Sequence, residues 1–256
     1  MYAKHILLLA PHPDDEVVGA GAAIGRARAQ GHRVSVAFLT TGVPDRSLLF
    51  PWQRAGHAAR VERRRGEAAE TAALLGFEIA FHQDHPTRTL KAHLGEMRAR
   101  VLAFIERHAI EMLWVPAYEG GHQDHDSANF LGSTLRDRVP VWEFAEYNNI
   151  GGKVLSQEFP CASGAEIAIA LDDAEIARKR AALALYPSER GNLAHIEAGR
   201  ECFRPLAGYD YGRAPHPGVL FYQRFQWVWP RHPRVDYTLP EEVCAALLSS
   251  QMTEGR

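Results

Sequence analysis

Short apolar runs alternate with longer amphipathic stretches through the first 150 residues of the chain. The apolar runs are rich in β-branched and aromatic side chains and predict strands at residues 5–10, 33–39, 77–81, 112–116 and 141–147. The stretches between them carry apolar residues at helical spacing and predict helices at 17–30, 61–75, 90–108 and from His125 to 135. Strands that alternate with helices predict an α/β fold with a Rossmann-like, doubly wound, mostly parallel sheet. The commonest strand order for its core is 3-2-1-4-5.

The pattern is looser after residue 150. It predicts a strand at 165–171, a helix that Asp172 caps and that ends at 185, and a second helix that ends near 199. One or two strands are expected at 218–229, and a closing helix at 240–249. Because no linker interrupts the 256 residues, we interpret them as a single domain: a Rossmann-like core over 1–150 and a C-terminal elaboration over 151–256.

Composition restricts the partners. The chain is 46% hydrophobic and 23% charged with a net charge of −2, which is typical of a globular protein and argues against nucleic acid or an anionic membrane as partner. No run approaches the ~18 apolar residues of a membrane span, and the first residues lack a secretory signal. The three cysteines are too widely spaced for a disulfide framework. We therefore expect a cytoplasmic protein, with homo-oligomers possible, that acts on a small molecule.

Two clusters of metal-ligand residue types follow predicted strands 1 and 4. The first is Pro11-His12-Pro13-Asp14-Asp15-Glu16, and the second is His122-Gln123-Asp124-His125. In the order 3-2-1-4-5 the winding reverses between strands 1 and 4, and ligands bind at the carboxyl ends of the strands at such a reversal. The two clusters are therefore expected to meet in one crevice.

A metal ion would explain why these side chains gather. Catalytic zinc takes three imidazole or carboxylate ligands and keeps one position for water. His12, Asp15 and His125 would supply such a set, and iron or cobalt could occupy the same ligands. For a lone Asp or His, helix capping or surface exposure would be the simpler interpretation, but two clusters at one crevice favour a metal centre.

The other polar residues of the two clusters are then predicted to act on the water, the substrate or a ligand. Asp14 would face the metal-bound water as general base. His122 would lie over the substrate and, as imidazolium, stabilise an oxyanion or protonate the leaving group. Asp124 is placed to orient a ligand histidine.

The tetrapeptide His-Gln-Asp-His also occurs earlier, at residues 82–85. This copy follows strand 3, about 10 Å farther across a sheet with ~4.8 Å between strands. We therefore expect His82 and His85 not to be ligands, although Asp84 can still reach a substrate. Arg64 has two open interpretations: it binds a substrate hydroxyl or phosphate, or it pairs with Glu67 on the helix surface.

The combined pattern resembles the LmbE-like (PIG-L) N-acetyl-sugar deacetylases, which are zinc hydrolases with a Rossmann-like fold. The resemblance spans about residues 5–205 and rests on PHPDDE, GHQDHD, Arg64-x-x-Glu67-Ala68, Leu75-Gly76, Lys179, Tyr186-x-Ser188 and Glu201-x-Phe203-Arg204. It implies removal of acetyl from an N-acetylglucosamine-type sugar or its conjugate. It also implies zinc on His12, Asp15 and His125, with Asp14 as base, His122 at the oxyanion and Asp84 at the substrate. The segment 82–86 departs from the family's commoner Pro-Asp-Gly type.

The sequence also contains features of two other classes of function. Gly19, Gly21 and Gly25 imitate the fingerprint of a dinucleotide-binding oxidoreductase. They lie inside a predicted helix, however, and strand 2 ends in Leu39-Thr40-Thr41 without an acid for a ribose, so close helix packing explains them better. A metal-binding protein without catalytic activity is the other alternative, and the presence of both Asp14 and His122 argues against it.

Aromatic residues gather in two further segments. The long loop at 40–58 contains Leu48-Leu49-Phe50-Pro51-Trp52 and is either a lid over the substrate or an oligomer contact. Near the C-terminus, aromatic side chains could stack on a sugar ring, but we expect them to be core: Tyr209, Tyr211, Trp227 and Trp229.

Overall fold

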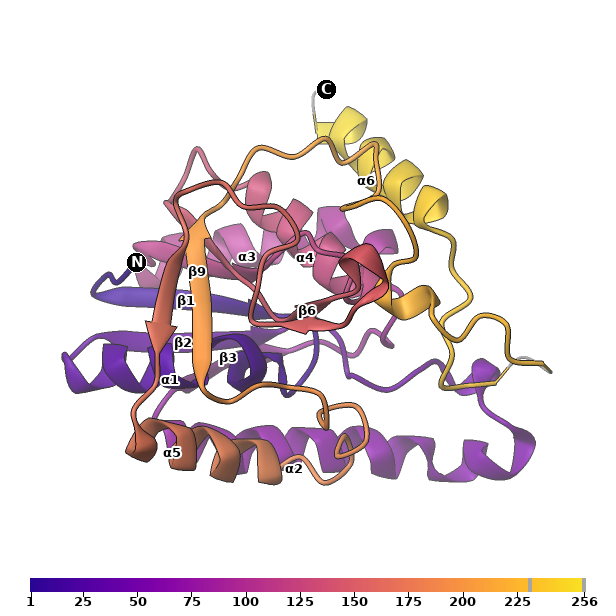
Figure 1. Cartoon of the computed structure of the whole chain (residues 1–256), viewed down its shortest axis with the longest axis horizontal. Helices are drawn as coiled ribbons and strands as arrows, with labels where there is room; N and C mark the ends of the chain where they lie inside the picture. The colour runs from indigo at the N-terminus through magenta and orange to yellow at the C-terminus, as the bar shows by residue number, and fades with distance from the viewer. Residues whose placement is uncertain (230–231, 255–256) are drawn as a thin grey trace.

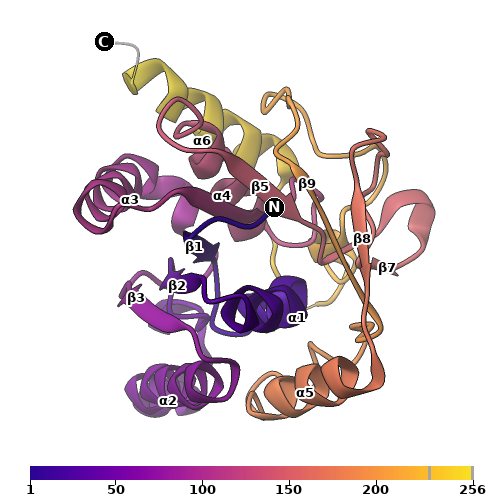
Figure 2. The same ribbon diagram turned by 90° about the vertical axis from the view of Figure 1, so that its left-hand side faces the viewer.

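A seven-stranded sheet with helices on both faces forms the centre of the computed structural model, which describes residues 1–229 and 232–254 (Figures 1 and 2). The strands lie in the order β3-β2-β1-β4-β5-β9-β8, so the predicted core order is confirmed. Neighbours from β3 to β5 pair in parallel, whereas β9 and β8 are antiparallel. The strand bounds are β1 His5–Ala10, β2 Arg33–Phe38, β3 Glu78–His82, β4 Met112–Pro116, β5 Val141–Phe144, β8 Ile167–Ala170 and β9 Arg200–Pro205. A separate ribbon pairs β6 (Tyr147–Asn148) with β7 (Leu155–Ser156).

Each face of the sheet has its own apolar core. Alternate residues of the fully buried strand β1 point to opposite faces, Ile6 and Leu8 to one core and Leu7 and Leu9 to the other. The first face is covered by α1 (Asp15–Ala29), α2 (His57–Leu75) and α5 (Asp173–Ala184), and the second by α3 (Leu94–His108), α4 (Gln123–Ser133) and α6 (Pro240–Glu254), as Figure 2 shows. Short 3-10 helices lie at η1 Arg46–Leu48, η2 Pro51–Gly56, η3 Leu90–Ala92, η4 Ile150–Gly152 and η5 Phe221–Gln223. Across the part of the chain described, no helix is both long and apolar enough to cross a bilayer.

Gly19 allows α1 to approach the sheet closely. A Cβ atom at this position would lie 2.1 Å from Cδ2 of Phe144 on β5, which is far inside van der Waals contact. The glycine therefore serves helix packing, as expected, and the turn after β1 is occupied by the first cluster of polar residues.

The second half of the chain follows the sequence predictions only in part: β8, α5 and α6 lie at the predicted strand and helices, but other segments differ. Strand β9 was not predicted, because its charged residues obscure the apolar pattern. Residues 187–199 form turns in place of the expected helix, and 218–229 form turns and η5 in place of strands. The core interpretation is right for Tyr211 but wrong for Trp227 and Trp229, which are 79% and 88% exposed.

A buried ion pair connects α5 and β9 to the middle of α1. Lys179 Nζ lies 2.8 Å from Glu201 Oε1, and neither side chain is exposed. The ammonium group also donates to the carbonyl of Val18, and the carboxylate accepts from the backbone N–H groups of Ala22 and Ala23. These bonds fix α1 against the C-terminal part of the chain.

We expect Lys179→Met to lower the free energy of unfolding by about 3 kcal/mol, because the carboxylate of Glu201 would stay buried without its cation. Urea unfolding followed by circular dichroism measures the change. Lys153 is exposed, so Lys153→Met should alter stability by less than about 0.5 kcal/mol. Equal stability of the two variants would contradict the role given to the ion pair.

Candidate metal centre and active site

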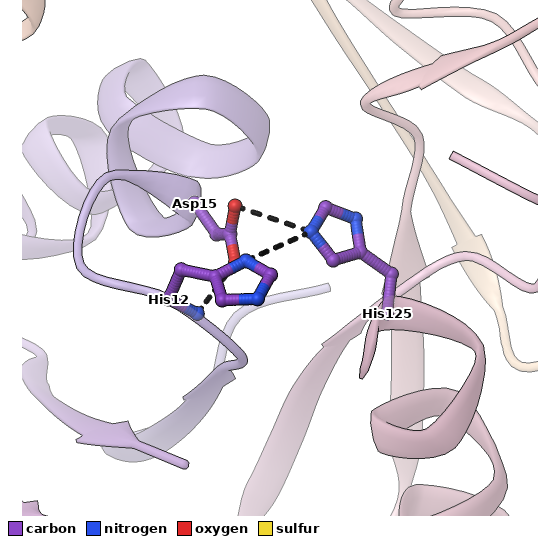
Figure 3. A group of neighbouring side chains, drawn as sticks. All are labelled: His12, Asp15 and His125. Atoms are coloured by element: carbon purple, nitrogen blue, oxygen red, sulfur yellow. Dashed lines mark hydrogen bonds and ion pairs between the residues drawn. The ribbon is translucent and has the colours of Figure 1, made fainter. Parts of the chain in front are cut away.

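The two predicted clusters meet at the carboxyl ends of neighbouring strands. β1 pairs with β4 and leads into the turn before α1, while the chain after β4 leads into α4. Figure 3 shows His12 and Asp15 from the first segment facing His125 on α4. The reversal of winding thus brings together side chains that are more than a hundred residues apart in the sequence.

The three facing side chains form a compact group of ligand residues, the ligand triangle. His12 Nδ1 lies 3.2 Å from Asp15 Oδ2, His125 Nε2 lies 3.3 Å from Asp15 Oδ1, and the two imidazole nitrogens are 3.4 Å apart. A tetrahedral ion with bonds of ~2.0–2.1 Å separates its ligands by about 3.3 Å. His12 contacts Oδ2 of Asp15 and His125 contacts Oδ1, and one ligand atom from each residue lies within 4.8 Å of the other two, so the three residues can face one ion.

A second group of metal-ligand types, His85, His93 and Glu96, does not fit in this way. The imidazole rings of His85 and His93 stack at 3.7 Å with only 12° between their planes. Their lone pairs then lie in nearly parallel planes and cannot converge on one ion. His82 stacks on Phe38 instead, so the structure keeps both histidines of the duplicate tetrapeptide apart from the triangle.

The far nitrogen of His12 is held by Asp124. Nε2 lies 3.1 Å from Asp124 Oδ2, and that carboxylate also accepts hydrogen bonds from Thr87 and the backbone of Arg88. Burial lowers the pKa of His12, but Asp15 and Asp124 outweigh it and raise the pKa to about 10. The site thus favours a cation at this position, and a metal ion would displace the proton.

Asp14 lies beside the triangle in a strained backbone conformation. Its φ is 133° and its ψ is −28°, a region that non-glycine residues rarely adopt and that occurs mainly at functional sites. Burial raises the pKa of Asp14 well above its ordinary value, while the guanidinium of Arg64 opposes that shift. A buried carboxyl with a raised pKa is suited to accept and return a proton.

Arg64 lies behind Asp14 and is only 3% exposed. Its Nη2 is 3.3 Å from Asp14 Oδ2 and also donates to the carbonyl of Pro13, while Nη1 contacts Ser188 and Glu189. The expected alternative of a surface ion pair is therefore wrong, although Glu67 does lie 3.9 Å away inside this buried network. Gly42 leaves room for the guanidinium, because a Cβ there would lie 2.9 Å from Nη2.

His122 is fixed in one tautomer. The backbone N–H of Asp124 donates to its Nδ1 at 3.0 Å, so the ring proton must be on Nε2. Burial, reinforced by the neighbouring His12, lowers the pKa of His122 well below its ordinary value. The bond at Nδ1 and the lowered pKa both favour a neutral imidazole with its N–H on Nε2 over the imidazolium that the sequence pattern suggested.

Asp84 lies outside these contacts. Its side chain is 90% exposed and pairs with Arg65 on α2.

Two buried carboxyl groups of the site were missed by the sequence analysis. Glu16 lies in the first turn of α1, where it is fully buried and accepts a hydrogen bond from the hydroxyl of Tyr186, and burial raises its pKa to about 7. Glu146 is also fully buried, with Oε2 lying 3.6 Å from His125 Nδ1. Its position just after the fifth strand, at the same edge of the sheet, is a signal that could have identified it.

The fold and the site together define a class: a Rossmann-like α/β protein with a candidate metal-binding group of residues at the reversal of its sheet. Residues 7–135 match the model of the GlcNAc-PI de-N-acetylase (PIG-L) family. The chain belongs to this family.

Individual relatives are also found. The diacetylchitobiose deacetylase of Thermococcus kodakarensis is 32% identical over 134 residues, which cover 50% of this chain and 48% of that protein, so the chain spans about half the length of this curated relative. The A40926 pseudoaglycone deacetylase Dbv21 has a similar structure, with a TM-score of 0.61, 18% identity and coverage of 80% and 99% of the two chains. A 4-carboxy-2-hydroxymuconate hydratase, GalB of Pseudomonas putida, aligns with a TM-score of 0.52, 18% identity and coverage of 81% and 98%. At such identities the solved structures establish the fold alone.

Proposed function

We propose that the chain is a zinc-dependent amidohydrolase that removes acetyl from an N-acetylated amino sugar, of the N-acetylglucosamine type, or from its conjugate. The observation that carries this proposal is the group of His12, Asp15 and His125, whose side chains contact one another at 3.2–3.4 Å, beside the buried Asp14 and the N–H donor of His122. Family membership and the deacetylase among the curated relatives support the same reaction class.

A zinc ion held by the three ligands would lower the pKa of its water and polarise the acetyl carbonyl. Asp14 takes the proton from the attacking water as the new carbon–oxygen bond forms. The Nε2–H of His122 donates to the developing oxyanion. Asp14 then returns the proton to the leaving amine as the carbon–nitrogen bond breaks, and the products are acetate and a free amino sugar.

The two candidate substrate-binding residues have different positions. Arg64 is buried against Asp14, so we propose that it acts on the substrate through that carboxylate and keeps it oriented. Asp84 is exposed, and we propose that it contacts the part of the conjugate that extends away from the metal centre.

A panel of N-acetylglucosamine conjugates, assayed for free amine with and without a chelator, tests the proposed function. We expect amine release from at least one conjugate, loss of release with the chelator and recovery on addition of zinc. Binding of a dinucleotide with no bound metal would indicate an oxidoreductase instead. Stoichiometric zinc with no amine release from any conjugate would indicate a metal-binding protein without this activity.

His122→Ala should lower kcat about 10²–10³-fold, because the oxyanion would lose a preorganised donor. Zinc content should stay at the wild-type level, since His122 is outside the ligand triangle. Steady-state kinetics with metal analysis of the same samples measures both quantities. A variant that lost its zinc would instead make His122 a ligand.

A further inference from the structure

Three polar atoms beside the metal centre are buried and lack a hydrogen-bond partner: Nδ1 of His125 and both carboxylate oxygens of Glu146. The nearest pair, Nδ1 and Oε2, is 3.6 Å apart, and neither side chain is exposed to solvent. A buried polar group without a partner costs about 1–3 kcal/mol, and more when it is charged. The facing positions of His125 Nδ1 and Glu146 Oε2 therefore point to a state of the protein in which the two atoms share a hydrogen bond.

The position of Glu146 is fixed independently of its side chain. Its backbone N–H donates to Glu119 at 2.7 Å, and its carbonyl accepts from the backbone of Gln157 at 2.8 Å. On the other side of His125, Nε2 faces Asp15 in the ligand triangle. The imidazole of His125 therefore lies between the metal centre and the carboxylate of Glu146.

His12 shows the same arrangement with the hydrogen bond already made. One ring nitrogen is in the triangle, and the other lies 3.1 Å from the carboxylate of Asp124. Ligand histidines commonly donate their second N–H to a carboxylate, which fixes the tautomer and makes the metal-binding nitrogen more basic. For His125, an approach of about 0.7 Å would bring the pair to the ~2.7–2.9 Å of a charge-assisted hydrogen bond.

We propose that Glu146 is the positioning residue of His125: its carboxylate accepts a hydrogen bond from Nδ1–H and so presents Nε2 to the metal. The inference rests on the metal centre of the proposed function and extends it, because each ligand histidine then has its own carboxylate. Glu146 touches neither substrate nor metal, and its effect reaches the reaction through His125.

Zinc affinity, measured by competition with a chromophoric chelator, tests this role. Glu146→Leu should weaken affinity about 10–100-fold, and Glu146→Gln should weaken it less, because an amide oxygen still accepts the Nδ1–H. Glu143→Gln is a matched control: Glu143 is equally buried on β5 but bonds to Arg204 and Tyr209. It should leave zinc affinity unchanged even if it lowers stability.

Nitrogen-15 NMR of the zinc-loaded wild type reports the tautomer of His125, which would not depend on Glu146 if Glu146 only stabilised the fold. His125 should be the Nδ1–H tautomer with a downfield ring proton, and Glu146→Gln should shift that proton but not the one on His12. The inference would be overturned by any of three results: wild-type zinc affinity in Glu146→Leu, an equal loss of affinity in Glu143→Gln, or an Nε2–H tautomer for His125. If the wild type binds zinc with the expected His125 tautomer but releases no amine, only the proposed function is refuted. If the wild type binds no zinc, the proposed function and the role of Glu146 are both refuted.

Discussion

His125→Ala is expected to empty the metal centre and to abolish amine release. In the proposed site His125 is one of three protein ligands, and its ring is fully buried between Asp15 and Glu146. Loss of the metal removes both the activated water and the polarised carbonyl, so we expect activity to fall by more than about 10⁴-fold. Metal analysis of the purified variant, together with the free-amine assay, measures both effects.

The duplicated tetrapeptide provides a control with the same local sequence. His85 occupies in residues 82–85 the place that His125 occupies in 122–125, but it stacks on His93 away from the triangle. His85→Ala should therefore keep the zinc content and the activity of the wild type. Equal zinc content in His125→Ala and the wild type would refute the ligand assignment.

The core of the fold and the meeting of the two clusters could be predicted because both depend on simple regularities. Buried parallel strands are continuous apolar runs, and the carboxyl ends of adjacent strands meet at one edge of the sheet. Once β1 and β4 are neighbours, His12 and His125 must lie near each other. The same argument separates His85 from the ligand triangle. Its tetrapeptide is identical to residues 122–125, but it follows β3, which lies at the edge of the sheet.

The C-terminal half could be predicted only in part: β8, α5 and α6 follow their sequence patterns, but the position of β9 depends on pairs of polar residues. Glu201 and Arg204 are buried on β9, where an isolated sequence would assign them to a surface, and their partners come from distant segments: Lys179 for Glu201, and Glu143 for Arg204. A buried charge on β9 can be recognised as paired only when the position of its partner in the fold is known. For the same reason, the sequence left open whether Arg64 lies on the helix surface, and its burial appears only with its partners Asp14 and Glu189 in place.

Local sequence also does not fix the protonation of the site. Whether His122 is an imidazolium or a neutral donor depends on a backbone N–H two residues later, which donates to Nδ1. Likewise, the role of Glu146 depends on which nitrogen of His125 faces the triangle. Both properties depend on how an imidazole ring is oriented in the folded chain, which the pattern of residues along the sequence does not specify.

Asp14→Asn should separate chemistry from metal binding. The change removes the carboxylate that accepts the proton of the attacking water, and loss of a general base costs about 10²–10⁴-fold in rate. Asparagine has the same shape and tolerates positive φ better than most residues, so the strained backbone at 133° should persist. We therefore expect a low kcat with a wild-type zinc content, measured on the same preparation.

Asp172→Asn is the control for this change, because asparagine caps the start of α5 as well as aspartate does and the site is not involved. A rate for Asp14→Asn within about tenfold of the wild type would mean that another group takes the proton. Loss of zinc would instead mean that Asp14 is a fourth ligand. His125→Ala and Asp14→Asn should both lose most of their activity, and the metal content distinguishes a lost ligand from a lost base.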